Sequence, residues 1–271
     1  MTLEILKKYN IKAKKSLGQN FLVNENIVNE ISEVIEVTGK NIIEVGPGYG
    51  ALTEKLINKK PKSLNLVELD REMINILNRR IDNGDFTLDG VYFKINNIDV
   101  LKYIPENKDY SVIANIPYYI TSPILRHFLY DVENKPESMV ILMQKDVGDK
   151  ILGKGKEKTS VLSLFVAKKC NIKDVLFVGK ENFIPAPKVE SSVLLFETHN
   201  LYNHINDKEF MDFIKKGFSE PRKKLSKNLL KYGYDKDLII QVFSKYSIGD
   251  NTRGEDINIA TWCNLFLEFN K

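Results

Sequence analysis

The stretch NIPYY, at residues 115–119, places an amide, a proline and two aromatic rings where an apolar, strand-like run ends. An exocyclic amine on an adenine ring is a poor nucleophile, because its lone pair is delocalised into the ring. Oxygen atoms that accept its two N–H bonds favour a tetrahedral nitrogen, and they free that lone pair for attack. Asn115 offers one side-chain oxygen, and a backbone carbonyl near Pro117, whose φ is fixed, offers the second. Tyr118 adds a ring face for a flipped base, so the stretch favours group transfer to an amino nitrogen over a loop with a packed tyrosine.

A glycine-rich segment, EVGPGYGALT at residues 44–53, lies between an apolar run and a helical pattern. Glycine allows a tight turn and a close approach of the backbone, and the next helix starts with free N–H groups. Gly46, Gly48 and Ala51 also satisfy the dinucleotide fingerprint, so this motif alone leaves an NAD-linked oxidoreductase open. Such an enzyme needs a proton donor, and none is evident beside the segment.

Carboxylates follow successive predicted strands. Glu68 and Asp70 end the second strand, where an acid can accept hydrogen bonds from both ribose hydroxyls of NAD or of S-adenosylmethionine. Asp99 follows the third strand. The E-x-G-x-G-x-G arrangement that begins at Glu44 resembles the first motif of S-adenosylmethionine-dependent methyltransferases, which hold the cofactor's adenine amine at the position of Asp99. A dinucleotide enzyme has no standard need for that acid.

The predicted elements alternate between strands and helices. Helical spacing is found at 27–37, 51–60 and 71–81, and strands are expected at 41–46, 63–70, 91–95, 110–115 and 138–144. Two further runs, 173–179 and 191–197, suit an antiparallel pair at the sheet edge. Only helical patterns follow, at 207–218, 223–233, 236–246 and 257–269. We therefore expect an α/β, Rossmann-like class I methyltransferase fold with a mostly parallel sheet at residues 1–199, and a small all-helical domain at 200–271.

The composition excludes several classes of protein. No apolar run among the 271 residues reaches the roughly 20 that span a membrane, and the N-terminus lacks the core of a secretory signal, so we expect a cytoplasmic protein. Two distant cysteines and three scattered histidines predict neither a disulfide framework nor a metal site. The net charge is only +4, but lysines and arginines gather at 7–15 and 215–231, as a polyphosphate partner would select. A solvated face in a lysine-rich chain is the other interpretation of each cluster.

A narrower resemblance extends over almost the whole chain. KKSLGQNFL, EVGPGYGALT, VELD, NIPYYITSPIL, MQKDV and FIPAPKVESSVLLF are similar, in order and spacing, to motifs of the ribosomal RNA adenine dimethyltransferases, the kasugamycin-sensitivity family. The resemblance implies S-adenosylmethionine as cofactor. It implies that the cofactor pocket is lined by Asn20, Leu22, Gly46, Gly48, Glu68, Asp99 and Asn115. It also implies that Phe183 faces the target adenine opposite Tyr118, although Phe183 could instead be a core residue.

Two branches of this family are plausible. One dimethylates two adjacent adenosines in the 3′-terminal hairpin of 16S rRNA during assembly of the small ribosomal subunit. The other is the macrolide-resistance type, which dimethylates one adenosine of 23S rRNA. The segments FSEPRKKLSKNL and TRGEDINIATWCNLF resemble the C-terminal domain of the assembly branch. Pro221 departs from a basic residue that this branch often has there, and positions 116 and 119 depart from the commoner Leu and Asn.

The same resemblance implies that rRNA phosphates are held by the basic clusters, and the residues expected to do so are Lys14, Lys15, Arg222, Lys223, Lys224 and Lys227. The implied partner is the small subunit or its assembly intermediate, and the family likeness suggests a monomer. Two other classes of protein stay open. A DNA adenine methyltransferase would share the NIPYY motif, and a non-enzymatic assembly factor could keep the pocket and use it little.

Overall fold

The computed structural model describes residues 2–154 and 158–270. The chain divides into two compact units, the first comprising Met1–Gly148 and Ile172–Thr198, and the second Asp149–Asn171 and His199–Lys271. The sequence-based boundary at 199/200 did not anticipate that residues 149–171 belong to the second unit. No helix in the described ranges is long and apolar enough to cross a bilayer.

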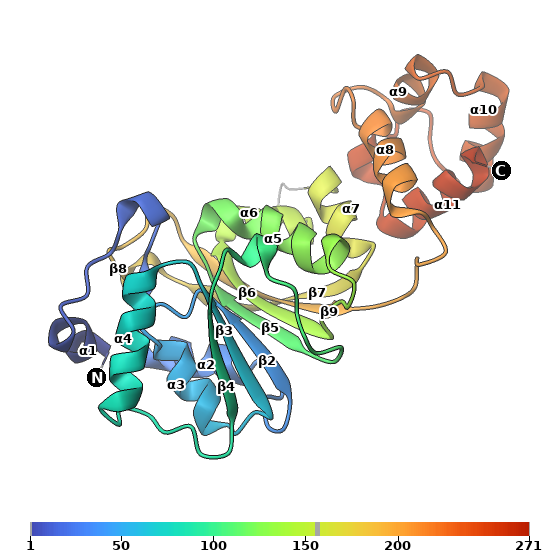
Figure 1. The fold of residues 1–271 in the computed structure, drawn as a ribbon. Helices are drawn as coiled ribbons and strands as arrows, with labels where there is room; N and C mark the ends of the chain where they lie inside the picture. The colour runs from blue at the N-terminus through green and yellow to red at the C-terminus, as the bar shows by residue number, and fades with distance from the viewer. Residues whose placement is uncertain (1, 155–157, 271) are drawn as a thin grey trace. The chain divides into compact units, whose positions relative to one another are not determined.

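The first unit is built on a sheet of seven strands, counted over the described residues (Figure 1). Its strands, in spatial order, are β4 (Tyr92–Asn97), β3 (Ser63–Glu68), β2 (Asn41–Val45), β5 (Ser111–Asn115), β6 (Ser138–Gln144), β9 (Ser191–Thr198) and β7 (Cys170–Val178). The pairs from β4 to β6 are parallel, and β9 is antiparallel to β6. The expected Rossmann-like, mostly parallel sheet is therefore confirmed, with β9 and β7 as neighbours at one edge.

The order of the strands creates a crevice. The chain moves outward from β2 to β3 and β4, and then returns to place β5 on the other side of β2. At such a reversal, the loops after adjacent parallel strands diverge and leave room for a ligand at the carboxyl ends. The register brings these ends level, because Val45 pairs with Val67 on one side and with Ala114 on the other.

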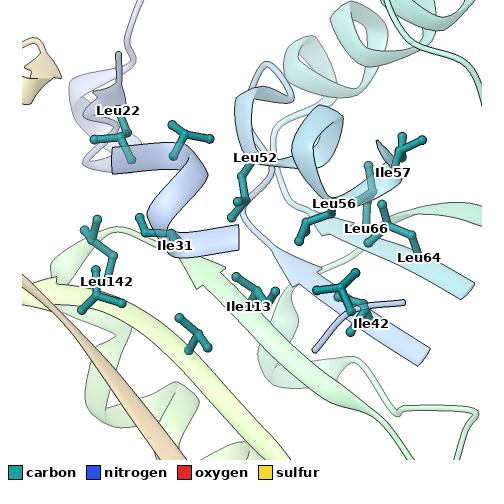
Figure 2. Packing of buried hydrophobic residues seen from close by; sticks show 14 of the residues in the cluster. Leu22, Ile31, Ile42, Leu52, Leu56, Ile57, Leu64, Leu66, Ile113 and Leu142 are labelled. Carbon is teal, nitrogen blue, oxygen red and sulfur yellow. The ribbon is translucent and has the colours of Figure 1, made fainter. Parts of the chain in front are cut away.

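Three amphipathic helices cover one face of the sheet: α2 (Glu25–Glu33), α3 (Ala51–Asn58) and α4 (Arg71–Asp82). Figure 2 shows Leu52 and Leu56 of α3 packed over Ile42 and its strand neighbours. Helix α2 starts at the side-chain cap of Asn24 and ends earlier than the predicted residue 37. Further short elements precede or follow the strands: η2 (Val100–Lys102), η3 (Tyr118–Ile120), α5 (Thr121–Arg126) and a π-helical turn at His127–Asp131.

The N-terminal segment contributes α1 (Thr2–Lys8), the short turn η1 (Lys15–Leu17) and β1 (Phe21–Leu22). Strand β1 pairs with β8 (Phe183–Ile184) in a two-stranded antiparallel sheet, in which Leu22 is opposite Phe183. The hydroxyl of Tyr49 donates to the Leu22 carbonyl at 2.8 Å, and the rings of Phe21 and Tyr49 meet edge to face. This segment is therefore tied to the glycine-rich loop and to a strand about 160 positions later in the chain.

The second unit contains α7 (Val161–Ala167), α8 (Asp207–Gly217), α9 (Leu225–Lys231), α10 (Lys236–Lys245), η6 (Gly254–Asp256) and α11 (Ile259–Phe269), and α6 (Lys145–Leu152) enters it. Its core surrounds the buried ring of Trp262 and includes Leu164 of α7. The buried ammonium of Lys168 donates to the Ile205 carbonyl at 2.9 Å and pairs with Asp207. These contacts explain why residues 149–171 belong with the C-terminal helices.

Candidate active site

A cavity of about 330 Å³ opens at the carboxyl ends of the parallel strands. All of the residues that the sequence predicted for cofactor binding and catalysis line it: Asn20, Leu22, Gly46, Gly48, Glu68, Asp99, Asn115, Pro117, Tyr118 and Phe183. Their individual roles remain predictions. Their convergence follows from the fold, because they come from the loops after neighbouring parallel strands and from the small sheet that β1 of the N-terminal segment forms with β8.

The glycine-rich loop needs glycine for two separate reasons. Gly46 has a φ of +69°, and a Cβ atom there would lie 2.9 Å from the Asn115 carbonyl oxygen. Gly50, at φ +88°, precedes α3, and a Cβ there would lie 2.7 Å from a methyl of Leu77. The loop thus passes directly against the end of β5, and its backbone approaches the NIPYY stretch with no side chain between them.

Glu68 is held in a defined orientation at the end of β3. Its Oε2 accepts from the Gly48 N–H at 3.2 Å, and its Oε1 accepts from the Asp70 N–H at 2.8 Å. The side chain is buried, and this burial raises its pKa. A carboxylate fixed in this way presents its remaining lone pairs to the cavity, where a diol could donate to them.

Asp70, the acid that follows β3, holds neighbouring segments of the chain together. It caps α4 by accepting from the Glu72 N–H, and it also accepts from the side chains of Lys14, at 2.7 Å, and Gln19, at 3.0 Å. Burial by itself would raise the pKa of Asp70, but the hydrogen bonds that Asp70 accepts, above all from Lys14, outweigh burial and lower this pKa. Asp70 therefore ties the N-terminal segment to α4, and Glu68 is the acid of this pair that lines the cavity.

Asp99 lies where β4 gives way to the turn η2. Its Oδ1 accepts from the Leu101 N–H at 3.0 Å, so that Asp99 caps this turn. The aliphatic residues Ile98, Val100 and Leu101 beside it also line the cavity. The sequence analysis did not identify these apolar neighbours. They are suited to pack against the face of a nucleobase, beside the acceptor Asp99.

The NIPYY stretch surrounds the other side of the cavity. Asn115 is partly exposed at the end of β5, and within the described part of the chain its side chain has no protein hydrogen-bond partner. Pro117 precedes the turn η3 at φ −56°. The Tyr118 hydroxyl and the Ser191 hydroxyl are 2.6 Å apart, and burial raises the pKa of Tyr118. The ring of Tyr118 is therefore anchored at its far end, whereas the amide of Asn115 is available to a ligand.

Phe183 both lines the cavity and belongs to the hydrophobic core. It is only 3% exposed and packs in the same cluster as Leu22, its partner across the small antiparallel sheet. The core interpretation is therefore confirmed, and the role of Phe183 opposite the target adenine stays a prediction. Asn20, which precedes this sheet, donates from its side chain to the Gly18 carbonyl at 3.3 Å.

Two buried charged residues near the loop were not identified as site residues from the sequence. Glu44 lines the cavity at 1% exposure, and its Oε2 has no hydrogen-bond partner among the described residues. Burial, assisted by the nearby charge of Glu68, raises the pKa of Glu44 from 4.5 to about 8. The sequence motif places Glu44 before the glycines, but a motif does not show that the Glu44 side chain is buried.

Arg80, on α4, supports the glycine-rich loop from outside the cavity. Its guanidinium donates to the carbonyls of Tyr49, at 2.8 Å, and Gly50, at 3.1 Å. It also pairs with Glu54 and Asp85 and is 1% exposed. In the sequence this arginine looks like one more charge on a surface helix, because nothing local signals its distant partners.

The predicted RNA-contacting residues are distributed over both units. Lys15, Arg222, Lys223 and Lys227 are exposed, and Lys224 is partly buried at the start of α9. Lys14 is different, because its ammonium pairs with Asp70 and Glu72 at 2.7 and 2.9 Å. Pro221 lies in a turn before α9, which begins at Leu225. No metal-binding cluster occurs in residues 2–154 and 158–270, and Cys170 and Cys263 are both buried and free.

The hydrogen-bond acceptors and apolar side chains that line the cavity fit S-adenosylmethionine. Acceptors occur at the ends of β3 and β4, and apolar side chains and the buried acid Glu44 line the same cavity. A nucleoside with hydroxyls, a flat base and a cationic tail matches this combination.

The chain is similar to known proteins over nearly its whole length. The family model described as ribosomal RNA adenine dimethylase matches residues 10–271. The ribosomal RNA small subunit methyltransferase A of Mycoplasma mobile is 39% identical over 95% of this chain and 98% of its own length. The enzyme of the same name from Bacillus cytotoxicus is 35% identical over 97% and 94% of the two chains.

Solved structures show the same fold. A dimethyladenosine transferase from Plasmodium falciparum superposes with a TM-score of 0.78 at 23% identity, covering 91% of this chain and 96% of its own. The 23S rRNA methyltransferase ErmE gives a TM-score of 0.75 at 20% identity, with coverages of 93% and 100%. The cavity and the match over nearly the full length lead to one conclusion: the chain belongs to the ribosomal RNA adenine dimethylase family and is an S-adenosylmethionine-dependent rRNA adenine dimethyltransferase.

Proposed function

We propose that the chain dimethylates the N6 amines of two adjacent adenosines in the 3′-terminal hairpin of 16S rRNA, within the small ribosomal subunit or its assembly intermediate. The observation that carries the proposal is the convergence of Asn115, Pro117 and Tyr118 with the acidic cofactor side of a single cavity. The choice of subunit is supported by the relatives at 39% and 35% identity, whose names specify the small subunit, whereas ErmE is only 20% identical.

The positions of the residues support a role for each of them. Bound S-adenosylmethionine supplies an electrophilic methyl group. Glu68 and Asp99 would accept hydrogen bonds from its ribose and its base, and Asn20, Leu22, Gly46 and Gly48 would form further walls of its pocket. The Asn115 oxygen and a carbonyl near Pro117 accept the two N–H bonds of the target amine, which leaves its lone pair directed at the methyl group. No strong base is needed, because the amine proton becomes acidic once the methyl has been transferred.

Tyr118 and Phe183 hold the target base. The hydroxyl bond to Ser191 fixes the ring of Tyr118, and the pairing of Phe183 with Leu22 fixes the second ring, so neither has to be ordered on binding. A flipped adenine gains stacking on such preorganised rings, which repays part of the cost of leaving its own stack.

The basic residues would grip rRNA phosphates. Lys15, Arg222, Lys223 and Lys227 are exposed and suited to this role, with Lys224 beside them, while Lys14 would have to leave its acidic partners to join them. We expect affinity for the subunit to fall steeply with salt, and Lys227→Ala to lower the slope of log Kd against log salt by about 1. We also propose that the protein acts as a monomer in the cytoplasm.

The test is the transfer of tritiated methyl groups to small subunits that lack the 3′-hairpin methyls, with 23S rRNA and DNA as competing substrates. We expect two methyl groups on each of the two adenosines, located by mass spectrometry. Asn115→Ala should abolish transfer, and Asn58→Ala, an exposed change outside the cavity, should leave it unchanged. Methylation of 23S rRNA alone would assign the chain to the resistance branch, methylation of DNA would contradict an RNA target, and no transfer would favour a non-enzymatic assembly factor.

A further inference from the structure

Two consecutive tyrosines at the cavity have opposite environments. Tyr118 is partly buried, and its hydroxyl is bonded to Ser191. Tyr119 also lines the cavity, yet 65% of its surface is exposed, and its hydroxyl has no protein partner within the described residues. Core packing therefore accounts for the first ring and not for the second, which lies at the rim of the site.

The exposed ring of Tyr119 is nevertheless held in place. It belongs to the turn η3, where the Ile120 N–H donates to the Pro117 carbonyl at 3.2 Å and the Thr121 hydroxyl donates to the Tyr118 carbonyl at 3.0 Å. One side of the ring rests on Gly18, since a Cβ atom built there would lie 3.3 Å from Cε1 and 3.5 Å from Cδ1 of Tyr119.

Gly18 contributes to this arrangement through its own geometry. Its φ of +62° lies in the left-handed region, and a side chain there would also meet the Cβ of Pro117 at 3.3 Å. A residue with no side chain at this position thus lets the N-terminal segment support the ring closely from one side. An exposed aromatic ring that is held close to the backbone beside a cavity is suited to stack on a base in single-stranded RNA.

We propose that Tyr119 stacks on the base of the nucleotide next to the target adenosine and so contributes to the choice of single-stranded rRNA. The inference rests on the proposed function, in which two adjacent adenosines occupy the cavity in turn. The neighbouring base therefore differs between the two reactions. Stacking tolerates this change because every base has a π-face, whereas hydrogen-bond recognition of one base would favour only one of the two positions.

The test measures steady-state methyl transfer to small subunits by Tyr119→Ala and Tyr119→Phe, together with the Kd for S-adenosylmethionine by calorimetry. We expect Tyr119→Ala to raise the KM for the subunit by about 5- to 150-fold, the range for loss of one base–aromatic stack. Tyr119→Phe keeps the ring and should stay close to the wild type. The Kd for the cofactor should not change in either variant. Tyr92→Ala serves as the matched control, because that tyrosine is 60% exposed and lies outside the cavity.

Three outcomes would overturn the inference. An unchanged KM in Tyr119→Ala would show that the ring does not contact RNA. A parallel loss of cofactor affinity would make the ring a cover for S-adenosylmethionine instead, and failure of Tyr119→Phe to restore the KM would assign the effect to the hydroxyl. If the wild type transfers no methyl to small subunits, the proposed function fails, which is a distinct result because it precedes any difference between variants.

Discussion

Glu44 is expected to make the first unit less stable as the pH rises. Its pKa is about 8 in the folded protein, against an ordinary value of 4.5, and burial is the main cause. Below pH 4.5 the carboxyl is protonated in both states, so it has no effect on stability. Between pH 4.5 and about pH 8, Glu44 keeps its proton in the folded state but has lost it in the unfolded chain. The free energy of unfolding therefore falls as the pH rises through this interval.

The size of the effect follows from the shift. Each unit of pH removes about 1.4 kcal/mol of stability while the two states differ by one proton. Over the whole interval the loss approaches roughly 5 kcal/mol, an upper limit that applies once both states are ionised. Because Glu44→Gln holds an uncharged group of the same shape at every pH, this variant should lack the loss and be several kcal/mol more stable than the wild type above pH 8.

The assay is urea unfolding from pH 5 to pH 9 without cofactor, followed by far-ultraviolet circular dichroism. Trp262, the single tryptophan of the sequence, lies in the second unit, so its fluorescence gives an internal reference that Glu44→Gln should not alter. Glu30→Gln, on an exposed residue of α2, is the matched control. Parallel pH profiles for the wild type and Glu44→Gln would refute the reasoning, because they would mean that Glu44 ionises in the fold as it does in water.

Three further changes test how the site is held. Gly39 has a φ of +68°, and a Cβ atom there would have no other atom within 4 Å, so Gly39→Ala should lower stability only by the left-handed strain of about 1–2 kcal/mol. Gly46→Ala should lower stability more and should weaken S-adenosylmethionine binding in calorimetry. Equal losses of stability in the two variants would mean that contact with the end of β5 is unimportant. Arg80→Gln should reduce stability by about 3–5 kcal/mol in urea unfolding, because buried acids and two loop carbonyls lose their donor, and a loss below 1 kcal/mol would contradict this role. Tyr118→Phe and Ser191→Ala should each cost about 1 kcal/mol and be non-additive when combined, whereas additive losses would show that the two hydroxyls do not interact in solution.

The sheet and the main site residues could be predicted because their signals are local. Several strands are apolar runs with a polar residue at or just after the carboxyl end, and parallel strands bring those ends to one edge. Glu68, Asp99 and Asn115 therefore converge once the strand order is known. The same argument could not separate Glu68 from Asp70, since the capping of α4 depends on where that helix begins.

Long-range contacts were beyond such reasoning. Arg80 looks like an ordinary charge on an amphipathic helix, and its carbonyl partners are about 30 positions away. Residues 149–171 precede strand β9 in the chain, yet they pack with the C-terminal helices through Leu164 and Lys168. The spacing of apolar and polar residues along the chain predicts neither contact. Both contacts depend on which surfaces remain uncovered after the sheet has formed.

The pairing of β1 with β8 also determines when the site can exist. Leu22 is made early in synthesis, but its partner Phe183 is added only after every parallel strand of the sheet. A nascent chain can therefore assemble the glycine-rich loop and the end of β5 while the cavity still lacks one wall. The last residues that line the cavity are therefore added late in translation, and a chain truncated before residue 183 would lack the wall that Phe183 contributes.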